Sequence, residues 1–351
     1  MRAIVQDVYG PPDVLRLEET EQPVPGPGEV LLRVQAAGLD QGVWHLVTGT
    51  PYALRAAGFG LRAPKQRVRG LDVAGRVEAV GPGVSRFRPG DQVYGTCTGS
   101  FAEYACAKED ELAPRPARLT PEEAAVVTIS ATTALQALRT GRLKPGQRVL
   151  VIGAAGGVGT YAVQLAKALG AAHVTAVCSA PKADLVRSLG ADRAVDYTHE
   201  DPTDGVHRYD LVLDIAGNRP LHRLRRALTP RGTLVIVGGE TDGRWIGGHD
   251  RQLRALLLSP FTPHRLRGLA ATPRPEDLRV LGELVESGAL TPVVDRTYPL
   301  AEVPDAIRRL REGHVRGKIA IRVQGDGPGP PSASAAHPVR AKNSWTTHRG
   351  G

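Results

Sequence analysis

The sequence predicts an α/β protein in which a β-rich N-terminal domain precedes a doubly wound parallel sheet. A length of 351 residues is enough for about two domains with well-buried cores. Roughly the first 115 residues hold short apolar or alternating runs between Gly/Pro turns, which is typical of a small barrel or sandwich. From residue 149 onward, strand-like and helix-like patterns alternate, which indicates parallel strands with helices on both faces.

Short strands are expected in the N-terminal part at residues 2–5, 29–36, 75–80, 91–94 and 100–105. Glycine–proline turns separate them, for example Pro25-Gly26-Pro27-Gly28. A helix is expected to begin after Thr120, because Thr120 can cap it, Pro121 suits its first position and Glu123 completes a capping box. The apolar run over 124–138 continues this helix.

The most specific local pattern is a glycine turn after an apolar strand at 149–152. The turn covers 153–159, and an apolar helical face follows it as far as Gly170. A strand, a glycine turn and a helix form the phosphate-binding element of a dinucleotide fold, because backbone and free helix N–H groups can approach a pyrophosphate. A purely structural turn is the alternative. The expected pyrophosphate contacts are Ala155, Gly156, Gly157, Val158 and Gly159.

The rest of the chain continues the alternation of strands and helices. Further strands are expected at 174–177, 211–213, 234–237, 293–298 and 317–323, and helices at 157–169, 181–189, 219–228, 275–287 and 302–312. Residues 325–351 are rich in Pro, Ser, Ala and Gly without apolar periodicity, so we expect a disordered tail.

Bulk composition argues against several classes of protein. The net charge of +9 comes from scattered basic residues, and only four Phe and three Trp are present, so no nucleic-acid partner is expected. No run of about 18 apolar residues exists, and the N-terminus has no long apolar core, so we expect neither a membrane span nor a secretory signal. Three separated cysteines suit a reducing cytoplasm.

Several motifs occur in a fixed order along residues 1–323. They include Pro25-Gly26-Pro27-Gly28-Glu29-Val30, Phe87-Arg88-Pro89-Gly90-Asp91, Ser100-Phe101-Ala102-Glu103-Tyr104, Ala154-Ala155-Gly156-Gly157-Val158-Gly159 and Gly317-Lys318. Their order resembles the medium-chain dehydrogenase/reductase superfamily, in particular its zinc-free quinone oxidoreductase branch. The resemblance implies a GroES-like β-barrel catalytic domain at 1–122 and 260–324, and a Rossmann cofactor domain at 123–259. It also implies an active site between the domains and a homodimer through the cofactor domains.

The resemblance also bears on zinc. Zinc-dependent members place a Cys where this chain has Gly38-Leu39-Asp40 and a His where it has Gly70-Leu71-Asp72, and Leu71 cannot bind a metal. The four-Cys structural lobe is missing, because only Cys97 and Cys106 lie in its region. We therefore expect no metal site, which favours hydride transfer to an activated alkene or quinone over metal-assisted alcohol oxidation.

The cofactor is predicted to be NADPH. A site specific for NAD keeps an Asp or Glu about 20 residues after the glycines, whereas residues 177–182 contain no acid. Ser179 and Lys182 could bind a 2′-phosphate by hydrogen bond and charge. Tyr197 resembles the family tyrosine near the adenosine. The alternatives are a solvated Lys182 at a helix start and a packing role for Tyr197.

Other cofactor contacts are expected where parallel strands end, since ligands bind there in open α/β sheets. Ala216 follows one such strand, and Gly238 and Gly239 follow another. The two glycines would let the nicotinamide approach the backbone, or they form a simple tight turn. Lys318 matches a family motif near the cleft, with a solvated strand residue as the alternative.

The catalytic candidates are Asp40, His45, Tyr52 and Thr133. Reduction of an enone or quinone creates an anion on oxygen, which needs a nearby donor and a proton. Tyr52 resembles the proton-donating tyrosine of related enoyl reductases, and Thr133 resembles a threonine near the nicotinamide. The structural alternatives are packing for Tyr52 and His45, a loop cap for Asp40 and a core-helix position for Thr133.

An insert at 52–69 is unusual for the branch. It could form a lid over a lipophilic pocket, with Trp245 opposite it. The predicted function is therefore NADPH-dependent, zinc-independent hydride transfer to a quinone or an enone, with a small lipophilic molecule as the substrate. An NADP-dependent alcohol or carbonyl oxidoreductase is the first alternative, and a non-catalytic NADPH-binding sensor or structural protein is the second.

Overall fold

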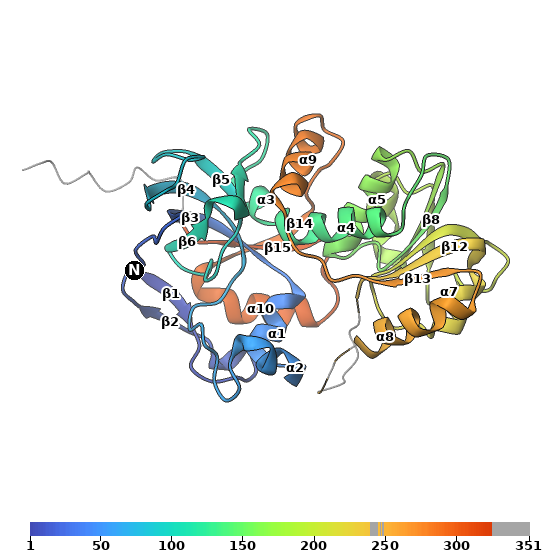
Figure 1. Cartoon of the computed structure of the whole chain (residues 1–351), viewed down its shortest axis with the longest axis horizontal. Helices are drawn as coiled ribbons and strands as arrows, with labels where there is room; N and C mark the ends of the chain where they lie inside the picture. The colour runs from blue at the N-terminus through green and yellow to red at the C-terminus, as the bar shows by residue number, and fades with distance from the viewer. Residues whose placement is uncertain (239–244, 246, 248, 325–351) are drawn as a thin grey trace, which may run out of the picture.

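The computed structural model of the chain describes residues 1–238, 245, 247 and 249–324. Two halves lie side by side, with the N-terminal strands in one and the doubly wound sheet in the other (Figure 1). Helix α4 (Thr128–Thr140) lies between them (Figure 1). The predicted α/β class is confirmed. The tail expected to be disordered, 325–351, lies outside the described residues.

A seven-stranded sheet builds the first half, in the order β14-β15-β3-β4-β5-β7, and β6 pairs with β3 outside this path. The strands are β3 (Glu29–Leu39), β4 (Asp72–Val80), β5 (Gln92–Thr96), β6 (Tyr104–Lys108), β7 (Leu112–Pro114), β14 (Val294–Pro299) and β15 (Lys318–Arg322). Strand β1 (Arg2–Val5) pairs separately with β2 (Arg16–Glu19). Val34, Val73 and Ile319, from three neighbouring strands, share one buried core.

The strand expected at 100–105 begins later than predicted. The ladder with β3 starts at Tyr104, which pairs with Arg33. Before that point, the Phe101 N–H donates to the Arg69 carbonyl, and Ala102 forms only an isolated bridge with Ala3. The alternating pattern before Tyr104 therefore reflects packing against the N-terminal strand rather than membership of the sheet.

Parallel strands form the second sheet, in the order β10-β9-β8-β11-β12-β13. They are β8 (Arg148–Ile152), β9 (His173–Cys178), β10 (Arg193–Asp196), β11 (Tyr209–Asp214), β12 (Leu228–Ile236) and β13 (Arg265–Gly268). Side chains alternate between its faces, as the pleat requires. Val149 and Val151 pack in one core with α4 and α5, and Leu150 and Ile152 pack in another with α7 and α8. The order reverses between β8 and β11, which creates a ligand-binding switch point at their carboxyl ends.

The helices of this half are α5 (Gly157–Ala168), α6 (Ala183–Ser188), α7 (Leu221–Arg226), α8 (His249–Leu258) and α9 (Pro275–Glu286), and those of the first half include α1 (Gln41–Thr48), α2 (Tyr52–Leu54), α3 (Pro121–Ala125) and α10 (Val303–Arg311). The capping box between Thr120 and Glu123 is confirmed. The single helix expected from there through 138 is instead two helices, because Val126 leaves the helical conformation with φ −100° and ψ 1°. In the described part of the chain, no helix is both long enough and apolar enough to cross a membrane.

The second sheet extends past residue 259, where the cofactor domain was expected to end. Strand β13 pairs with β12 through Leu266 and Leu234, which share a buried core. Helix α9 then packs between the halves: Leu278 and Leu281 share a core with α4 and α5, and the Tyr94 hydroxyl of β5 donates to the Leu278 carbonyl over 3.0 Å. The chain rejoins the sheet of the first half only at β14.

Candidate active site

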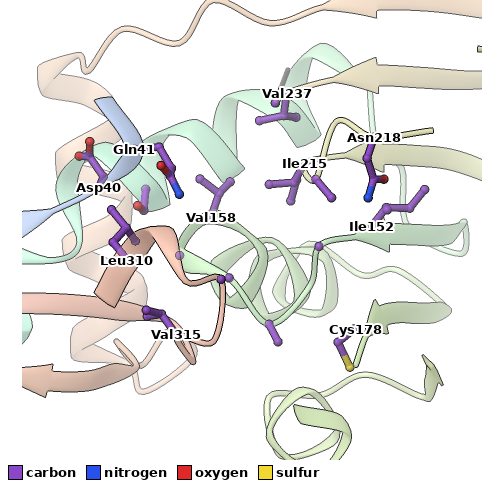
Figure 2. A pocket seen from close by; sticks show the side chains of 18 of the residues that line it. Asp40, Gln41, Ile152, Val158, Cys178, Ile215, Asn218, Val237, Leu310 and Val315 are labelled. Atoms are coloured by element: carbon purple, nitrogen blue, oxygen red, sulfur yellow. The ribbon is translucent and has the colours of Figure 1, made fainter. Parts of the chain in front are cut away.

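A cavity of about 1330 Å³ lies between the two halves, along the carboxyl ends of β8, β9 and β11 (Figure 2). Asp40 and Gln41 lie at one side of the view, and Cys178 and Asn218 lie at the other (Figure 2). The cavity therefore extends from the first half to the ends of the parallel strands.

The glycine turn forms one wall of the cavity at the start of α5. The N-cap residue Gly156 provides no side-chain hydrogen bond, so the helix N-terminus is open to an anion. The lining includes Ala155, Gly156, Gly157 and Val158. Gly159 lies against the turn itself, where an added Cβ would stand 2.1 Å from the Gly153 carbonyl oxygen, so the turn requires glycine there.

The ends of β11 and β12 approach each other closely beside the cavity. Ala216 and Gly238 both line it. A Cβ at Gly238 would stand 1.9 Å from the Ile215 carbonyl oxygen, so this approach also requires glycine. Gly239, the second glycine expected to contact the cofactor, lies outside the described residues.

A buried ion pair that the sequence analysis missed holds the loop after β11. Arg251 of α8 donates over 2.6 Å to Asp214 Oδ2 and over 2.6 Å to the Arg219 carbonyl. Asp214 Oδ1 accepts the Gly217 N–H over 3.2 Å. Burial raises the pKa of Asp214, although Arg251 lowers it. The pair fixes the loop that carries Ala216, but Arg251 has no local sequence signal to mark it.

Ser179, Lys182 and Tyr197, which were predicted to contact the cofactor, all line the cavity. The Lys182 ammonium donates to the carbonyl oxygens of Gly313, over 3.1 Å, and Val315, over 2.9 Å. Burial lowers the pKa of Lys182, and Asp295 raises it. Lys182 therefore links β9 to the loop before β15, rather than extending into solvent. The Tyr197 side chain is exposed.

At the other end of the cavity, three charged side chains form a buried cluster of Asp40, Asp72 and Lys318. The Lys318 Nζ lies 3.6 Å from Asp72 Oδ2 and 3.9 Å from Asp40 Oδ2. The Asp72 and Lys318 side chains are 0% and 2% exposed, and that of Asp40 is 12% exposed. Asp40 and Lys318 were expected here, and both line the cavity. Asp72 was missed as a functional residue, although the motif Gly70-Leu71-Asp72 was noted for its lost zinc ligand.

The carboxylates of the cluster are anchored through one oxygen each. Asp40 Oδ1 accepts the Val43 N–H over 3.2 Å and caps α1. Asp72 Oδ1 accepts the Ile129 N–H over 3.0 Å. Burial raises the pKa of Asp72 to about 7, with Lys318 lowering it and Asp40 raising it. Asp40 can therefore cap α1 and belong to the cluster at the same time, because Oδ1 makes the cap and Oδ2 faces Lys318.

His45 and Thr133 line the cavity but already have hydrogen-bond partners. His45 Nδ1 lies 2.8 Å from the Thr50 carbonyl oxygen, which can only accept, so Nδ1 carries a proton. The Thr133 hydroxyl donates over 2.7 Å to the carbonyl of Ile129, one turn earlier in α4. His45 Nε2 and the lone pairs of the Thr133 hydroxyl oxygen are still available to a ligand.

Tyr52 is not among the lining residues, and neither is any other residue of the 52–69 insert. Its ring meets Trp245 edge-on, with centroids 5.5 Å apart and planes at 85°. Arg55 stacks on the Tyr52 ring at 4.8 Å from its centroid. Trp245 therefore packs directly on the start of the insert and does not line the cavity itself, so the described residues show neither a lid over the cavity nor Tyr52 beside Asp40 and Lys318.

Two family models match the chain. One, described as "Alcohol dehydrogenase GroES-like domain", matches residues 26–117. The other, described as "Zinc-binding dehydrogenase", matches residues 189–321. The first half is thus a GroES-like domain, and the second carries the Rossmann-type parallel sheet.

Similar proteins cover nearly the whole chain. "Quinone-oxidoreductase QR1, chloroplastic" of Triphysaria versicolor is 33% identical over 92% of this chain and 98% of its own length. "NADPH-dependent alkenal/one oxidoreductase, chloroplastic" of Arabidopsis thaliana is 33% identical over 92% of this chain and 79% of its own length. The structure of the quinone oxidoreductase from Coxiella burnetii superposes with a TM-score of 0.81 at 30% identity, over 92% of this chain and 99% of that one. The chain therefore belongs to the medium-chain dehydrogenase/reductase superfamily, in its quinone oxidoreductase-like branch.

Proposed function

We propose that the protein is an NADPH-dependent oxidoreductase that transfers a hydride to a quinone or an α,β-unsaturated carbonyl compound without zinc. The observation that carries this proposal is that one cavity joins an open helix N-terminus to a buried Asp–Lys–Asp cluster. The names of the relatives, a quinone oxidoreductase and an alkenal/one oxidoreductase, support the same substrate classes.

The residues present fit a nicotinamide dinucleotide. The uncapped N-terminus of α5 suits a pyrophosphate. Gly159 in the turn and Gly238 after β12 have no room for a Cβ against neighbouring backbone carbonyls, so the backbone beside the cavity stays closely packed. The buried Lys318 Nζ lacks a hydrogen-bond partner and can bind a polar group of a ligand. Ser179 and Lys182, with no acid between them, favour a cofactor that carries a 2′-phosphate.

The donor set does not fit a catalytic zinc ion. Leu71 offers no ligand atom, and the Lys318 ammonium lies within 4 Å of both carboxylates, where a second cation would be repelled. Among the residues that the structure describes, no group of three or more His, Cys, Asp or Glu could hold a metal ion. These features support a mechanism in which protein donors, rather than a metal, polarise the substrate oxygen.

The bound nicotinamide would supply the hydride. The chain's own residues bind the substrate, exclude water and stabilise the charge that develops on the substrate oxygen. The cavity lining also includes the apolar side chains of Leu39, Leu71 and Ile129, which suit a lipophilic substrate. The Lys318 ammonium lines the cavity without a hydrogen-bond partner and can donate to an oxyanion. The Thr133 hydroxyl could donate there only by giving up its bond to the Ile129 carbonyl.

Anaerobic stopped-flow mixing tests the proposal. Chelator-treated protein carrying NADPH is mixed with a panel of quinones and enones, and oxidation of the nicotinamide is followed by absorbance. We expect rapid oxidation that added zinc does not increase. Activity on alcohols or simple carbonyls that requires zinc would favour the alcohol or carbonyl oxidoreductase. Tight NADPH binding without turnover across the panel would favour the non-catalytic sensor.

A further inference from the structure

Three polar atoms of the Asp40–Asp72–Lys318 cluster make no hydrogen bond. Asp40 Oδ2, Asp72 Oδ2 and Lys318 Nζ are all buried without a hydrogen-bond partner. The Nζ–Oδ2 separations of 3.6 and 3.9 Å are too long for direct hydrogen bonds. Because unsatisfied buried polar atoms are costly, each of these atoms is available to a ligand, a water or a shared proton.

The cluster adjoins the anion-binding wall of the cavity. The aliphatic stem of Lys318 lies against the glycine turn, since a Cβ at Gly157 would stand 2.9 Å from Lys318 Cδ. The preceding residue, Gly317, forms a parallel bridge with Gly156 and donates its N–H to the Ala155 carbonyl. An anion at the N-terminus of α5 is therefore a direct neighbour of the cluster.

Charge balance predicts how the cluster responds to such an anion. Two ionised carboxylates and one ammonium carry a net charge of −1, and one added proton makes the cluster neutral. A negative ligand next to a buried anionic cluster favours the protonated form. Asp72 is the member that titrates near neutrality, because burial raises its pKa to about 7.

Other groups that face Asp72 do not replace it in this role. Tyr161 of α5 and Cys97, which follows β5, both interact with it electrostatically, and burial raises the pKa of each further above neutrality. The Tyr161 hydroxyl is already engaged, because it donates to the Val126 carbonyl over 3.1 Å. The phenol and the thiol therefore stay neutral while Asp72 changes its charge.

We propose that Asp72 is a proton reservoir: the cluster takes up a proton when the dinucleotide binds, and Lys318 passes it to the substrate oxygen during reduction. The inference rests on the proposed function and assigns the source of its proton. Asp72 acts through Lys318, which lines the cavity and can contact the substrate, whereas Asp72 does not line it.

The proposed steps balance for an enone. A hydride that the bound nicotinamide would supply, by breaking one of its C–H bonds, forms a C–H bond at the β-carbon. The alkene pair shifts to the bond between the α-carbon and the carbonyl carbon, and the carbonyl π pair moves to oxygen, which gives an enolate. A Lys318 N–H bond then breaks, and its proton forms an O–H bond with the enolate. With a small movement of its flexible stem, the Lys318 amine closes the 3.6 Å separation from Asp72 Oδ2 and takes the proton of Asp72. Solvent later returns a proton to the cluster through Lys318, which lines the cavity. The net reaction consumes one hydride and one proton for each substrate reduced.

Calorimetry of cofactor binding tests the uptake step without turnover. NADPH is titrated into the full-length protein in two buffers of different ionisation enthalpy, and the difference gives the protons taken up. We expect uptake approaching one proton per site at about pH 8 and almost none at about pH 6, where Asp72 is already protonated. Asp72→Asn should abolish the uptake at the higher pH. Equal uptake in the wild type at the two pH values would overturn the proposal.

Asp277→Asn is the matched control. Asp277 is also buried, at 2% exposure, and pairs with Arg139 and Gln136 outside the cavity lining. This variant should keep the full wild-type uptake. Even if Asp72→Asn fails to fold, the pH dependence of uptake by the wild type still decides the question.

Turnover supplies the second readout. With an enone that the wild type reduces, kcat should fall as the pH rises through the pKa of the cluster. The Asp72→Asn variant should have a low kcat at every pH, and this kcat should no longer fall as the pH rises. An unchanged pH profile in the variant would overturn the reservoir while leaving the reductase function intact. If no substrate is reduced, the proposed function fails, and calorimetry still tests the proton uptake.

Discussion

Lys182 and Lys318 line the same cavity, but their surroundings differ. The Lys182 ammonium donates to two backbone carbonyls across the mouth of the site. The Lys318 ammonium is buried between two carboxylates and lacks a hydrogen-bond partner. The first arrangement is satisfied before any ligand arrives, and the second is not.

This difference indicates two roles for the same side chain. A ligand phosphate near Lys182 must compete with the two carbonyl oxygens for the ammonium. Its net binding free energy is therefore reduced by the hydrogen bonds that Lys182 gives up. A ligand near Lys318 meets a charge that has no such bonds to lose, in surroundings of low dielectric where its effect is larger. We therefore expect Lys182 to contribute to selectivity for the cofactor, and Lys318 to contribute to folding and catalysis together.

The largest effect is expected for Lys318→Met. Methionine keeps much of the stem but leaves Asp40 and Asp72 buried without their cation, which should destabilise the fold by about 3 kcal/mol. Loss of the proton-delivering group should also lower kcat by about 10²–10³-fold. Urea unfolding and single-turnover kinetics measure the two losses. Retention of wild-type kcat in a folded Lys318→Met variant would contradict the assignment of Lys318.

The instability of Lys318→Met should depend on pH. In the wild type, the folded pKa of Asp72 is about 7 and lies above its unfolded value. This group therefore contributes stability that is fully present below about pH 4 and is lost as the pH rises through about 7. Without Lys318, the folded pKa should rise further, so the loss continues to higher pH. Unfolding at about pH 6 and about pH 9 should show a larger deficit at the higher value.

Gly159→Ala should produce the next largest effect. Its Cβ would stand 2.1 Å from the Gly153 carbonyl, so the turn must shift, at a cost of about 1–3 kcal/mol in stability. NADPH binding should weaken by roughly 10–100-fold if the shift is felt at the pyrophosphate. Gly156→Ala is the control, because its nearest atom would be 3.5 Å away in an extended backbone. Equal unfolding free energies for the two variants would contradict the steric argument.

Lys182→Ala should have a smaller and more selective effect. It should weaken NADPH binding by about tenfold with little change for NADH, because only NADPH has the 2′-phosphate. Fluorescence titration with both cofactors measures the difference. Lys167→Ala removes another ammonium, paired with Asp192 away from the cavity, and should change neither Kd. An equal loss of affinity for both cofactors would mean that Lys182 acts only as a link to the Gly313–Val315 backbone.

The sequence predicts the glycine-turn side of the cavity better than the side that holds the Asp40–Asp72–Lys318 cluster. The glycine turn is local, because strand, turn and helix follow one another within about 20 residues, and Gly156 and Gly157 lie at the cavity as expected. The Asp40–Asp72–Lys318 cluster joins three segments far apart in the chain, and only the register of β3, β4 and β15 brings them together. Asp72 was missed for this reason. Arg251 was missed because its partner Asp214 ends a strand much earlier in the chain, and only the packing of α8 brings the two together.

Asp40 and Tyr52 also differ in how well the sequence predicts their positions. Asp40 caps α1 through a pattern that a local interpretation can find. Tyr52 lies only twelve residues later, but the end of α1 and Pro51 turn the chain away, so its ring meets Trp245 rather than the cavity. Proximity in sequence to a cleft residue is thus a poor guide once a helix intervenes.

Tyr52→Phe should therefore have the smallest effect of the series. The substitution removes only a hydroxyl, and the aromatic contacts with Trp245 and Arg55 remain possible. We expect kcat to change by less than about twofold, because Tyr52 does not line the cavity and the substitution keeps its packing. Steady-state kinetics with a quinone and an enone measures the change. A loss of about 10² or more in kcat with an unchanged Kd for NADPH would instead make Tyr52 the proton donor. That result would require the insert to close over the cavity during turnover, and it would transfer the role assigned to Lys318 to the opposite wall.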